Sequence, residues 1–413
     1  MVERNKCMNV PELRFKGFKK EWDFCSVGDF YYFKNGLNKG KEFFGFGTPI
    51  VNFTDVFNNR GLTSDILKGR VSLSKKEISS FEVKKGDIFF TRTSETLEEI
   101  GYPSVMLDES NDTVFSGFVL RGRAINEDPL SDLFKKYVFF TNDFRKEMIR
   151  KSSMTTRALT SGTSIKKMEF YFPENKMEQE KIGIFHSIID KEIIFITTRI
   201  KLLKQIKKAS LQSMFPQEGE TVPKVRFKGF KEGWKKEKLG NLFKERIENN
   251  INGELLSVTI NNGIIKASDN GRFDNSNNDK SHYKVVKIGD IVYNTMRMWQ
   301  GASGYSAYEG IVSPAYTVII PQEQVFPLFF AYLFKTQSLI NRFRIHSQGL
   351  TTDTWNLKFA GFSIIEVCFP KSKLEQQKIA SYFCNLDKQI SLQTQRLEKL
   401  KQIKAACLDK MFV

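Results

Sequence analysis

Two copies of one long amphipathic segment restrict the fold of this chain more than any other feature of its sequence. Residues 173–215 align without gaps on residues 370–412, with 20 identities in 43 positions at an offset of 197. Apolar residues recur at steps of three and four in both copies, and the steps average about 3.5, the period of a coiled-coil seam. Each copy therefore predicts a helix of about 40 residues, roughly 60 Å long.

The apolar face of each predicted helix is expected to pack on the other helix in an antiparallel coiled coil. The alternative, in which each helix packs only on its own domain, stays open at this point. The residues predicted to pair the helices or to bind partner proteins are Ile182, Phe185, Ile189, Ile196, Leu203 and Ile206 in the first copy and Ile379, Phe383, Leu386, Ile390, Leu397, Leu400 and Ile403 in the second.

A second repeat precedes each half. The stretch "PELRFKGFKKEW" (Pro11 to Trp22) returns as "PKVRFKGFKEGW" (Pro223 to Trp234), with eight of twelve positions identical at an offset of 212. Its Phe and Trp side chains are expected to seed the packing of a globule rather than to read a ligand. Because this offset exceeds that of the long segments by 15 residues, the first half carries extra residues in its middle, where the two halves should differ in specificity.

The middle of each half predicts a mixed α and β globule. Short β-rich runs such as "GDIFF" (Gly86 to Phe90) and "GDIVYNT" (Gly289 to Thr295) alternate with Gly and Asn turns, and helical patterns follow from Pro129 and Pro327. The predicted fold is α+β, with two such domains separated by the two long helices in a pseudo-two-fold repeat. The predicted divisions are 1–172, the helix 173–215, the linker 216–222, 223–369 and the helix 370–413.

The charge of the chain favours a polyanionic partner. There are 64 Lys and Arg against 47 Asp and Glu, a net charge of +17, which suits nucleic acid or an anionic membrane surface. No apolar run approaches the length of a membrane span, and the first ten residues lack a signal-peptide core. The five Cys are scattered without a CxxC pair, so neither a disulfide framework nor a zinc site is expected. We expect a cytoplasmic protein.

Catalytic motifs are not found in a convincing context. "FFGFG" (Phe43 to Gly47) and "SPAY" (Ser313 to Tyr316) imitate motifs of methyltransferases that use S-adenosylmethionine, but the first runs into a strand-like stretch instead of a helix, and the second lies in the other repeat. The three His residues are isolated, so no metal set or catalytic triad can be assembled. We predict no catalytic residue and no metal site in this chain.

Binding chemistry is present in two places of each half. A polar, basic loop follows each "GDI" run, and a cluster of Arg, Lys and hydroxyl side chains precedes each long helix. Arg, Asn, Gln and Thr can contact base edges in the major groove, and basic and hydroxyl side chains suit phosphates. The predicted DNA contacts are Arg92, Thr93, Ser94, Thr155, Thr156 and Arg157 in the first half and Asn294, Arg297, Trp299, Gln300, Arg344, Gln348, Thr351 and Thr352 in the second.

Nearly the whole chain resembles the specificity subunit of type I DNA restriction-modification systems. The resemblance rests on the duplicated "RFKGF" heads, the "GDI" runs, "ELLSVTINNG" (Glu254 to Gly263) and the paired long segments with "EQ.KI" and "LKQIK". It implies two target-recognition domains, each reading one half of a bipartite double-stranded DNA site. It also implies that the long helices hold these domains apart and bind two modification subunits, which methylate adenine.

The resemblance places all catalysis on partner subunits. Restriction subunits would cleave the DNA, and S-adenosylmethionine, ATP and Mg²⁺ would bind to the partners, so the chain itself would carry no cofactor. Because the two middles differ, the site should be asymmetric. Two other classes stay open: a self-contained methyltransferase or restriction-modification enzyme, which should show a cofactor motif, and a coiled-coil scaffold, which should not retain DNA selectively.

Overall fold

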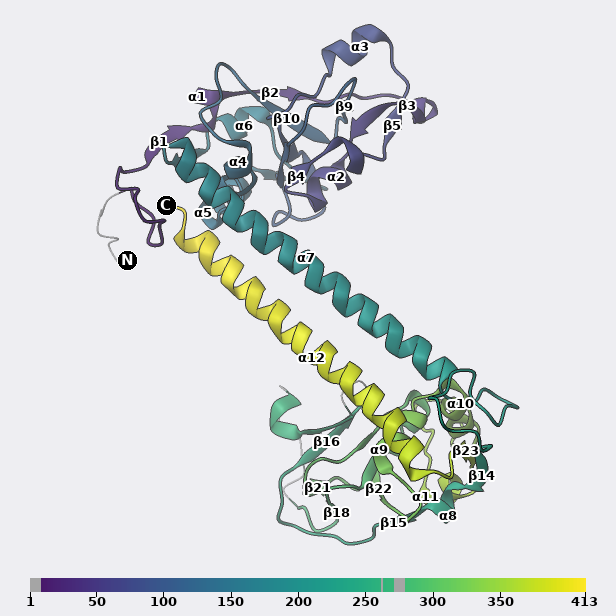
Figure 1. Ribbon diagram of the computed structural model, residues 1–413. Coiled ribbons are helices and arrows are strands. Elements are labelled where there is room, and N and C mark those ends of the chain that lie inside the picture. Colours follow the sequence, from purple (N-terminus) through teal and green to yellow (C-terminus); the bar gives the residue numbers. More distant parts are fainter. Residues whose placement is uncertain (1–8, 261–262, 271–278) are drawn as a thin grey trace. The chain divides into compact units, whose positions relative to one another are not determined.

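The computed structural model describes residues 9–260, 263–270 and 279–413, and the chain forms two compact units. Unit 1 consists of Met1–Thr197 together with Arg396–Val413, and unit 2 is Thr198–Gln395. The two longest helices, α7 (Lys176–Ser213) and α12 (Lys373–Lys410), each pass from one unit into the other (Figure 1). Each unit therefore contains a globular part, the start of one long helix and the end of the other.

A five-stranded sheet forms the centre of unit 1, in the order β2-β10-β6-β8-β4. All four residues of β6, "IFFT", are buried, which explains why the sequence reads there as a continuous apolar run rather than an alternating one. The strands of this sheet are β2 (Tyr31–Asn35), β4 (Gly61–Leu62), β6 (Ile88–Thr91), β8 (Pro103–Met106) and β10 (Val119–Ala124).

Three smaller sheets complete unit 1, in the orders β1-β13, β5-β3-β9 and β11-β12-β7. Their strands are β1 (Asp23–Ser26), β3 (Phe44–Val51), β5 (Arg70–Val71), β7 (Thr93–Ser94), β9 (Val114–Phe115), β11 (Ser153–Met154), β12 (Ala158–Leu159) and β13 (Glu169–Phe172). The shorter helices are α1 (Val27–Phe30), α2 (Phe53–Asn58), α3 (Lys75–Ser80), α4 (Asp132–Val138), α5 (Asn142–Lys151) and α6 (Gly162–Lys166), with 3₁₀ turns η1 (Lys41–Phe43) and η2 (Ser64–Ile66).

Unit 2 repeats this plan around a four-stranded sheet in the order β15-β22-β19-β20. Its strands are β14 (Lys235–Lys238), β15 (Phe243–Glu245), β16 (Leu256–Thr259), β17 (Gly263–Lys266), β18 (Lys284–Val286), β19 (Ile291–Asn294), β20 (Ser303–Tyr305), β21 (Gly310–Val312), β22 (Tyr316–Pro321) and β23 (Glu366–Phe369). Its helices are α8 (Leu239–Leu242), α9 (Pro327–Leu333), α10 (Gln337–Ile345) and α11 (Phe359–Ser363), with η3 (Ala267–Asn270) and η4 (Met298–Gln300).

The 15 extra residues of the first half lie in three places of unit 1. Equivalent residues of the two units are separated by 212 at Tyr31/Phe243, 203 at Asp87/Asp290, 200 at Pro103/Ser303 and 197 at Leu120/Thr317. Nine extra residues therefore lie between β2 and β6, three in the connection from β6 to β8, and three between β8 and β10. The two units share their framework and differ in what is inserted into it.

Within each unit, the start of one long helix lies antiparallel beside the end of the other. In unit 1, Asp190 of α7 forms an ion pair with Lys404 of α12 at 2.5 Å, and Glu192 pairs with Arg396 at 2.5 Å. In unit 2 the same pairing occurs with the helices exchanged. Lys207 of α7 contacts Asp387 of α12 at 2.5 Å.

A Phe two residues after the end of each long helix fills the core of the unit. In unit 1, Phe412 lies 6.1 Å from Trp22 between ring centroids and stacks on Phe134 at 5.5 Å. In unit 2, Phe215 occupies the equivalent place, 6.3 Å from Trp234 and 5.5 Å from Phe329. Burial of aromatic side chains of this size dominates core energetics, so each core depends on the terminal residues of the opposite half's helix.

Two of the residues predicted to pair the helices or to bind partner proteins do not pair the helices. Ile206 and Ile403, which are equivalent positions, are 46% and 41% exposed and lie outside a buried seam, so that binding of a partner protein stays a prediction for them. Ile182 belongs to the core around Trp22, and Phe185 packs edge-on against Phe15 at 6.1 Å, so these two serve the globular part. The other predicted pairing residues are buried or half-buried: Ile189, Ile196, Leu203, Ile379, Phe383, Leu386, Ile390, Leu397 and Leu400. The heptad pattern alone does not tell which surface covers each apolar position.

Candidate nucleic-acid interface

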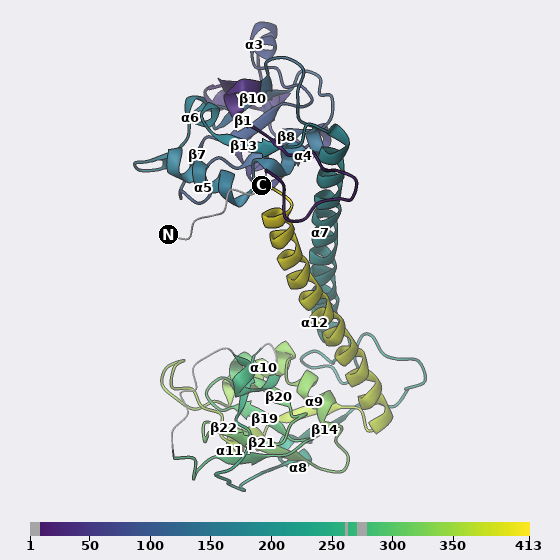
Figure 2. The same ribbon diagram turned by 90° about the vertical axis from the view of Figure 1, so that its left-hand side faces the viewer.

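The structure brings together the two polar segments that the sequence singled out in unit 1. Strand β7, from the loop after the "GDI" run, pairs with β12, which pairs with β11 in a small antiparallel sheet. The hairpin of β11 and β12 lies beside β7, which is labelled in Figure 2. It carries Thr155, Thr156 and Arg157, and all three are exposed. Arg157 reaches Glu95 at 3.1 Å. One edge of unit 1 therefore presents both segments to solvent.

In unit 2 the two corresponding segments also lie together, but no strand equivalent to β7 pairs with the hairpin among the described residues. Gln348 and Asn356 form an antiparallel bridge that closes a hairpin, and the Trp355 ring lies 5.1 Å from the ring of Trp299. The backbone N–H of Leu357 donates to the carbonyl of Thr295 at 2.8 Å. Thr351 and Thr352 lie in the exposed loop of this hairpin.

The same backbone hydrogen bond fixes this arrangement in both units. In unit 1 the Thr160 N–H donates to the Arg92 carbonyl at 3.1 Å. In unit 2 the equivalent hydrogen bond joins the Leu357 N–H to the Thr295 carbonyl. The loop after the buried strand, residues 91–102 or 294–302, is thus tied to the segment before the long helix. Two segments about 60 residues apart in the sequence form one surface in each unit.

The predicted contacts differ in how far they are exposed. In unit 2, Arg297, Gln300, Arg344, Gln348, Thr351 and Thr352 are exposed, and Asn294 and Trp299 are half-buried. In unit 1, Arg92 and Thr93 are half-buried, and Arg92 donates weakly to the Gly117 carbonyl at 3.5 Å. Ser94 departs from the prediction, because it is 6% exposed and its hydroxyl accepts the Thr96 N–H at 3.3 Å. Ser94 supports the loop from within.

The repeated head segments hold the start of the long helices. The Arg14 guanidinium donates to both carboxylate oxygens of Glu178, at 2.6 and 2.9 Å, and Trp22 Nε1 lies 3.4 Å from the same carboxylate. Arg226 and Trp234 repeat this on Glu375, with the bidentate contacts at 2.6 and 2.8 Å. Both Glu side chains are 1% exposed, so these are buried ion pairs rather than helix-capping charges.

The neighbouring glutamines complete this framework. Gln179 Oε1 accepts the Ser131 N–H at 2.6 Å, and its amide donates to Pro173 and Pro129 carbonyls. Gln376 makes equivalent contacts in unit 2: its Oε1 accepts the Phe326 N–H at 2.7 Å, and its amide donates to two backbone carbonyls. The heads were predicted to serve packing, and these polar contacts were not predicted. The identity of Arg, Trp, Glu and Gln in both copies was the signal that could have indicated them.

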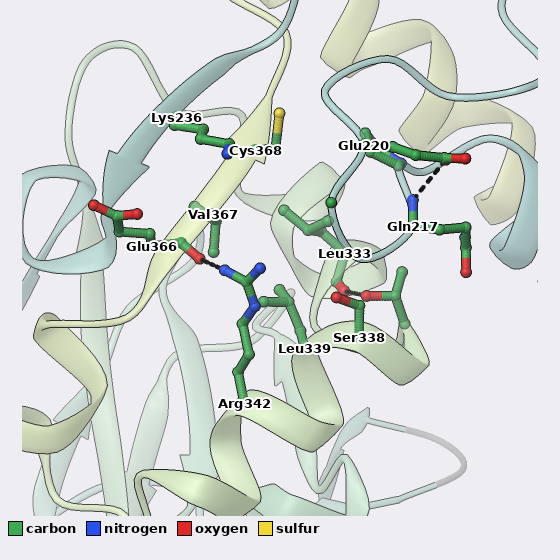
Figure 3. Close-up of a pocket in the computed structure, with 13 residues that line it drawn as sticks. Gln217, Glu220, Lys236, Leu333, Ser338, Leu339, Arg342, Glu366, Val367 and Cys368 are labelled. Atoms are coloured by element: carbon green, nitrogen blue, oxygen red, sulfur yellow. Dashed lines mark hydrogen bonds between the residues drawn. The ribbon is translucent and has the colours of Figure 1, made fainter.

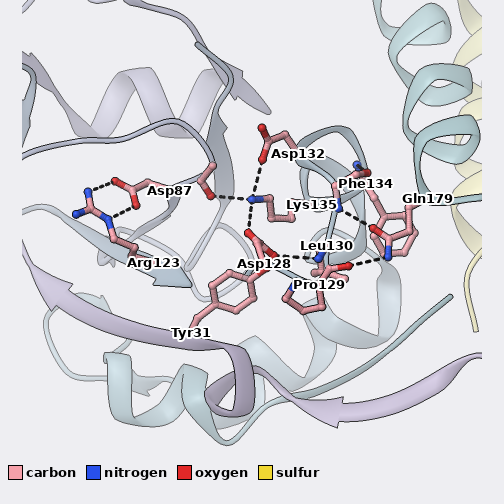
Figure 4. Close-up of polar contacts among 12 residues, drawn as sticks. Tyr31, Asp87, Arg123, Asp128, Pro129, Leu130, Asp132, Phe134, Lys135 and Gln179 are labelled. Atoms are coloured by element: carbon pink, nitrogen blue, oxygen red, sulfur yellow. Dashed lines mark hydrogen bonds and ion pairs between the residues drawn. The ribbon is translucent and has the colours of Figure 1, made fainter. Parts of the chain in front are cut away.

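The Asp of each "GDI" run is also a framework residue. Asp87 accepts two hydrogen bonds at 2.6 Å from Arg123 of β10 (Figure 4), and Asp290 accepts two from Arg246, at 2.8 and 3.0 Å. The hydrogen bonds with Asp290 raise the pKa of Arg246. Each Asp also accepts a backbone N–H three residues before it, from Lys84 or Lys287. These pairs fix the entry of the strand that leads to the exposed loop.

A buried lysine in unit 1 is fully committed to local contacts. Lys135 Nζ donates to Asp128 at 2.6 Å, to Asp132 at 2.8 Å and to the Gly86 carbonyl at 2.8 Å (Figure 4). Tyr31 donates to the same Asp128 at 2.6 Å, and its burial raises the pKa of the phenol. A lysine whose three protons are donated in this way stabilises the fold and has no free proton for catalysis.

The cavity shown in Figure 3 is small, about 80 Å³, and lies in unit 2 between the turn after α7 and the strand β23. Arg342 donates to the Glu366 carbonyl at 2.6 Å across its wall. Ligand pockets for drug-sized molecules usually measure about 300–1,000 Å³, so this cavity is smaller than such a pocket. The Arg342 contact ties α10 to the sheet.

Metal and membrane sites are not found in the part of the chain that the structure describes. No group of three or more His, Cys, Asp and Glu side chains is arranged to hold a metal ion among these residues. Among the same residues, no helix is both long and apolar enough to span a bilayer. The "FFGFG" stretch forms part of strand β3 and not a cofactor-binding turn before a helix.

Comparison with known proteins identifies the fold. Residues 231–402 match the family model "Type I restriction modification DNA specificity domain". The S subunit of a type I restriction-modification system from M. genitalium is similar in structure, with a TM-score of 0.61 and 15% sequence identity over 98% of this chain and 99% of that one. The HsdS subunit from Thermoanaerobacter tengcongensis aligns with a TM-score of 0.46 and 13% identity over 95% and 96% of the two chains. No curated protein sequence matches the chain significantly.

The fold of the chain is therefore similar to that of the M. genitalium S subunit over nearly the full length of both chains. Residues 231–402 match the family of type I restriction modification DNA specificity domains, and the resemblance to the specificity subunits of type I systems is confirmed. The match covers the second half only, while the structural similarity extends over both units.

Proposed function

We propose that this chain is the DNA sequence-recognition subunit of a type I restriction-modification complex and binds an asymmetric bipartite DNA site, one half-site per unit. The observation that carries the proposal is the contrast between an identical framework and two unlike loops. Arg14–Glu178 and Arg226–Glu375 hold equivalent positions, whereas loop 91–102 is three residues longer than loop 294–302 and differs in sequence. We call these loops reader loop 1 and reader loop 2.

The exposed chemistry of the reader loops suits a DNA duplex. Arg297 and Gln300 are exposed at the turn of reader loop 2. Arg297 can donate two hydrogen bonds to guanine, and Gln300 can donate one to adenine and accept one from it. The adjoining hairpins carry Thr-Thr pairs, whose hydroxyls suit phosphates. The net charge of +17 adds a long-range attraction to DNA that falls with salt.

Partner subunits have two equivalent apolar surfaces available on the long helices. Phe195 and Ile403 in unit 1 are 58% and 41% exposed, and their counterparts in unit 2, Leu392 and Ile206, are 63% and 46% exposed. Large exposed apolar side chains that recur at equivalent positions of both units are candidates for interaction sites. Two matching surfaces support the docking of two modification subunits, one on each unit, with restriction subunits joining the complex.

Catalysis and cofactors belong to the partners in this proposal. The buried charged clusters of the described residues are occupied by framework contacts such as Asp87–Arg123 and Lys135–Asp128. S-adenosylmethionine would bind to the modification subunits, and ATP and Mg²⁺ to the restriction subunits. The chain acts in the cytoplasm as the part that selects the site.

The proposal is tested by expressing the chain with a modification subunit and mapping methylated adenines. A single asymmetric motif of two parts with a fixed gap is expected. The matched control is expression of the modification subunit alone, which should give no such motif. Methylation without a bipartite motif, or a chain that retains DNA without sequence preference, would contradict the proposal in favour of an enzyme or a scaffold.

A further inference from the structure

Each reader loop ends at an equivalent pair of backbone carbonyls. β8 follows reader loop 1 and pairs with β6 so that Pro103 lies opposite Phe90, and β20 follows reader loop 2 with Ser303 opposite Tyr293. Two residues before these positions, Gly101 and Gly301 have φ of 63° and 83°, which favour glycine. The carbonyls of Gly101 and Pro103 in unit 1 therefore correspond to those of Gly301 and Ser303 in unit 2.

Two arginines bind this carbonyl pair in unit 1. Arg145 of α5 donates to Gly101 O at 3.0 Å and to Glu98 O at 2.9 Å, and Arg60 donates to Pro103 O at 3.4 Å. Both guanidinium groups lie over the Tyr102 ring, 4.7 and 4.9 Å from its centre. Burial lowers the pKa of each to about 10, so both remain charged at neutral pH.

A single lysine binds the corresponding pair in unit 2. Lys335, at the end of α9, donates to Gly301 O, to Ser303 O at 2.8 Å and to Ile260 O at 3.1 Å. An ammonium group has three protons, and all three carbonyls are served only while the group is charged. A neutral amine has two protons and one lone pair, so one carbonyl would lose its donor.

We propose that Lys335 is a positioning residue that sets the shape of reader loop 2, and that recognition by unit 2 is therefore sensitive to pH where recognition by unit 1 is not. The inference rests on the proposed function of the two loops and assigns to Lys335 a role that no sequence motif indicates. Lys335 contacts the loop from beneath and is not itself a base reader.

The surroundings of Lys335 place its loss of charge in an accessible range. Burial lowers the pKa of this lysine to about 8. Lys207 of α7 lowers it further and Asp387 of α12 raises it. Further ionisable groups on the neighbouring segments are Tyr332 of α9, Arg297 before η4, Tyr305 of β20, and Arg342 and Arg344 of α10.

Loss of this proton affects the loop without weakening the fold. The pKa of Lys335 is lower in the folded chain than in the unfolded one, so the unfolded chain binds more protons between about pH 8 and 10.5. This group's contribution to the free energy of folding therefore becomes more favourable as pH rises through that window. A purely structural lysine would show no loss of DNA discrimination there.

The test measures DNA binding by the complex with modification subunits, using the duplex identified by methylation mapping and duplexes altered in one half-site. Discrimination is the ratio of dissociation constants for altered and intact sites, measured at pH 7 and pH 9. For the wild-type complex we expect discrimination at the unit 2 half-site to fall by roughly tenfold at pH 9, the effect of about 1.4 kcal/mol. Discrimination at the unit 1 half-site should stay constant.

Two variants and one control sharpen the test. Lys335→Met should show the low discrimination at both pH values, and Lys335→Arg should keep high discrimination at pH 9. Lys244→Met, at an exposed lysine on β15 of the same unit, should behave as wild type. If discrimination fell equally at both half-sites from pH 7 to pH 9, or fell at neither, the inference would be overturned and the proposed function would remain intact. A wild-type complex without any bipartite motif would overturn both.

Discussion

Unit 1 and unit 2 build a common framework from several equivalent residues and differ most in their exposed loops. The Arg–Glu–Trp cluster, the Gln contacts, the Asp of the "GDI" run and the terminal Phe coincide in the two units. The differences lie between β2 and β6, in the reader loops and in the hairpins. A duplicated framework therefore keeps two recognition surfaces in equivalent places while their sequences change independently.

The largest expected effect is on the free energy of unfolding, and it tests whether the two buried Arg–Glu pairs stabilise their units equally. Glu178→Ala and Glu375→Ala each leave a buried guanidinium without its carboxylate, which typically costs about 3–5 kcal/mol. Because both Glu side chains are 1% exposed, we expect similar losses in the free energy of unfolding, measured by denaturant titration. Glu174→Ala, which removes the exposed partner of Lys20, is the control and should change little. A large loss from only one of the two variants would contradict the equivalence.

A buried histidine distinguishes the two cores. His186 is fully buried among Tyr137, Phe185 and Phe412, near Asp190 and Lys404, and burial lowers its pKa to about 4. The equivalent residue in unit 2 is Phe383, a buried aromatic that does not titrate.

The lowered pKa of His186 makes unit 1 sensitive to acid. The unfolded chain binds a proton that the folded chain excludes, so stability is lost as pH falls from about 6.5 toward 4, by about 3 kcal/mol at most. His186→Phe, which copies unit 2, should remove this loss, as measured by thermal unfolding from pH 7 to 4. An unchanged acid sensitivity in the variant would contradict this role.

The reader loops should act on separate half-sites. Arg92→Ala and Arg297→Ala each remove one candidate base contact, and a good bidentate contact contributes about 1–3 kcal/mol of discrimination. We expect each variant to relax recognition of one half-site and to leave the other intact, as read from the methylation motif of cells that carry the partner subunit. Each variant is the control for the other. A motif unchanged in both halves would exclude these arginines as readers.

The smallest expected effect concerns the hairpins. Arg157 follows the Thr155–Thr156 pair in unit 1 and is exposed, whereas Asp353 follows the Thr351–Thr352 pair in unit 2. Arg157→Ala should weaken binding equally for all sequences and reduce the slope of log affinity against log salt by about 0.9. Asp353→Ala removes a negative charge and should not reduce that slope. Binding titrations at several salt concentrations measure both, and equal slopes for Arg157→Ala and wild type would show that Arg157 does not contact phosphate.

Local patterns in the sequence predicted the elements but not their contacts. The 20 identities of the long segments predicted two equivalent helices, and the "GDI" runs predicted the central strands β6 and β19. The Arg14–Glu178 pair joins residues 164 apart, which no periodic pattern connects. The heptad pattern also does not show which surface covers each apolar position. It therefore placed Ile206 and Ile403 in a seam, although each lies on an exposed side of its helix.

The candidate interface was predicted at the level of segments. Composition identified the four polar segments, and the structure brings them together in pairs through the Thr160–Arg92 and Leu357–Thr295 hydrogen bonds. Ser94 was assigned to DNA because it is polar, but its burial depends on how the loop folds back. Lys335 could not be found from the sequence, since its three carbonyl partners belong to two other loops.

The two units differ in when all of their residues become available during synthesis, because unit 2 is one continuous segment and unit 1 is two. Unit 2 is continuous in the sequence and can close once residues 198–395 have been made. Unit 1 begins first but needs Phe412 beside Trp22 and the Lys410 carbonyl beside the Leu13 N–H. Trp22 and Phe134 of the first globule therefore stay incompletely covered until residues 396–413 have been made. That interval is when such a chain most needs a chaperone.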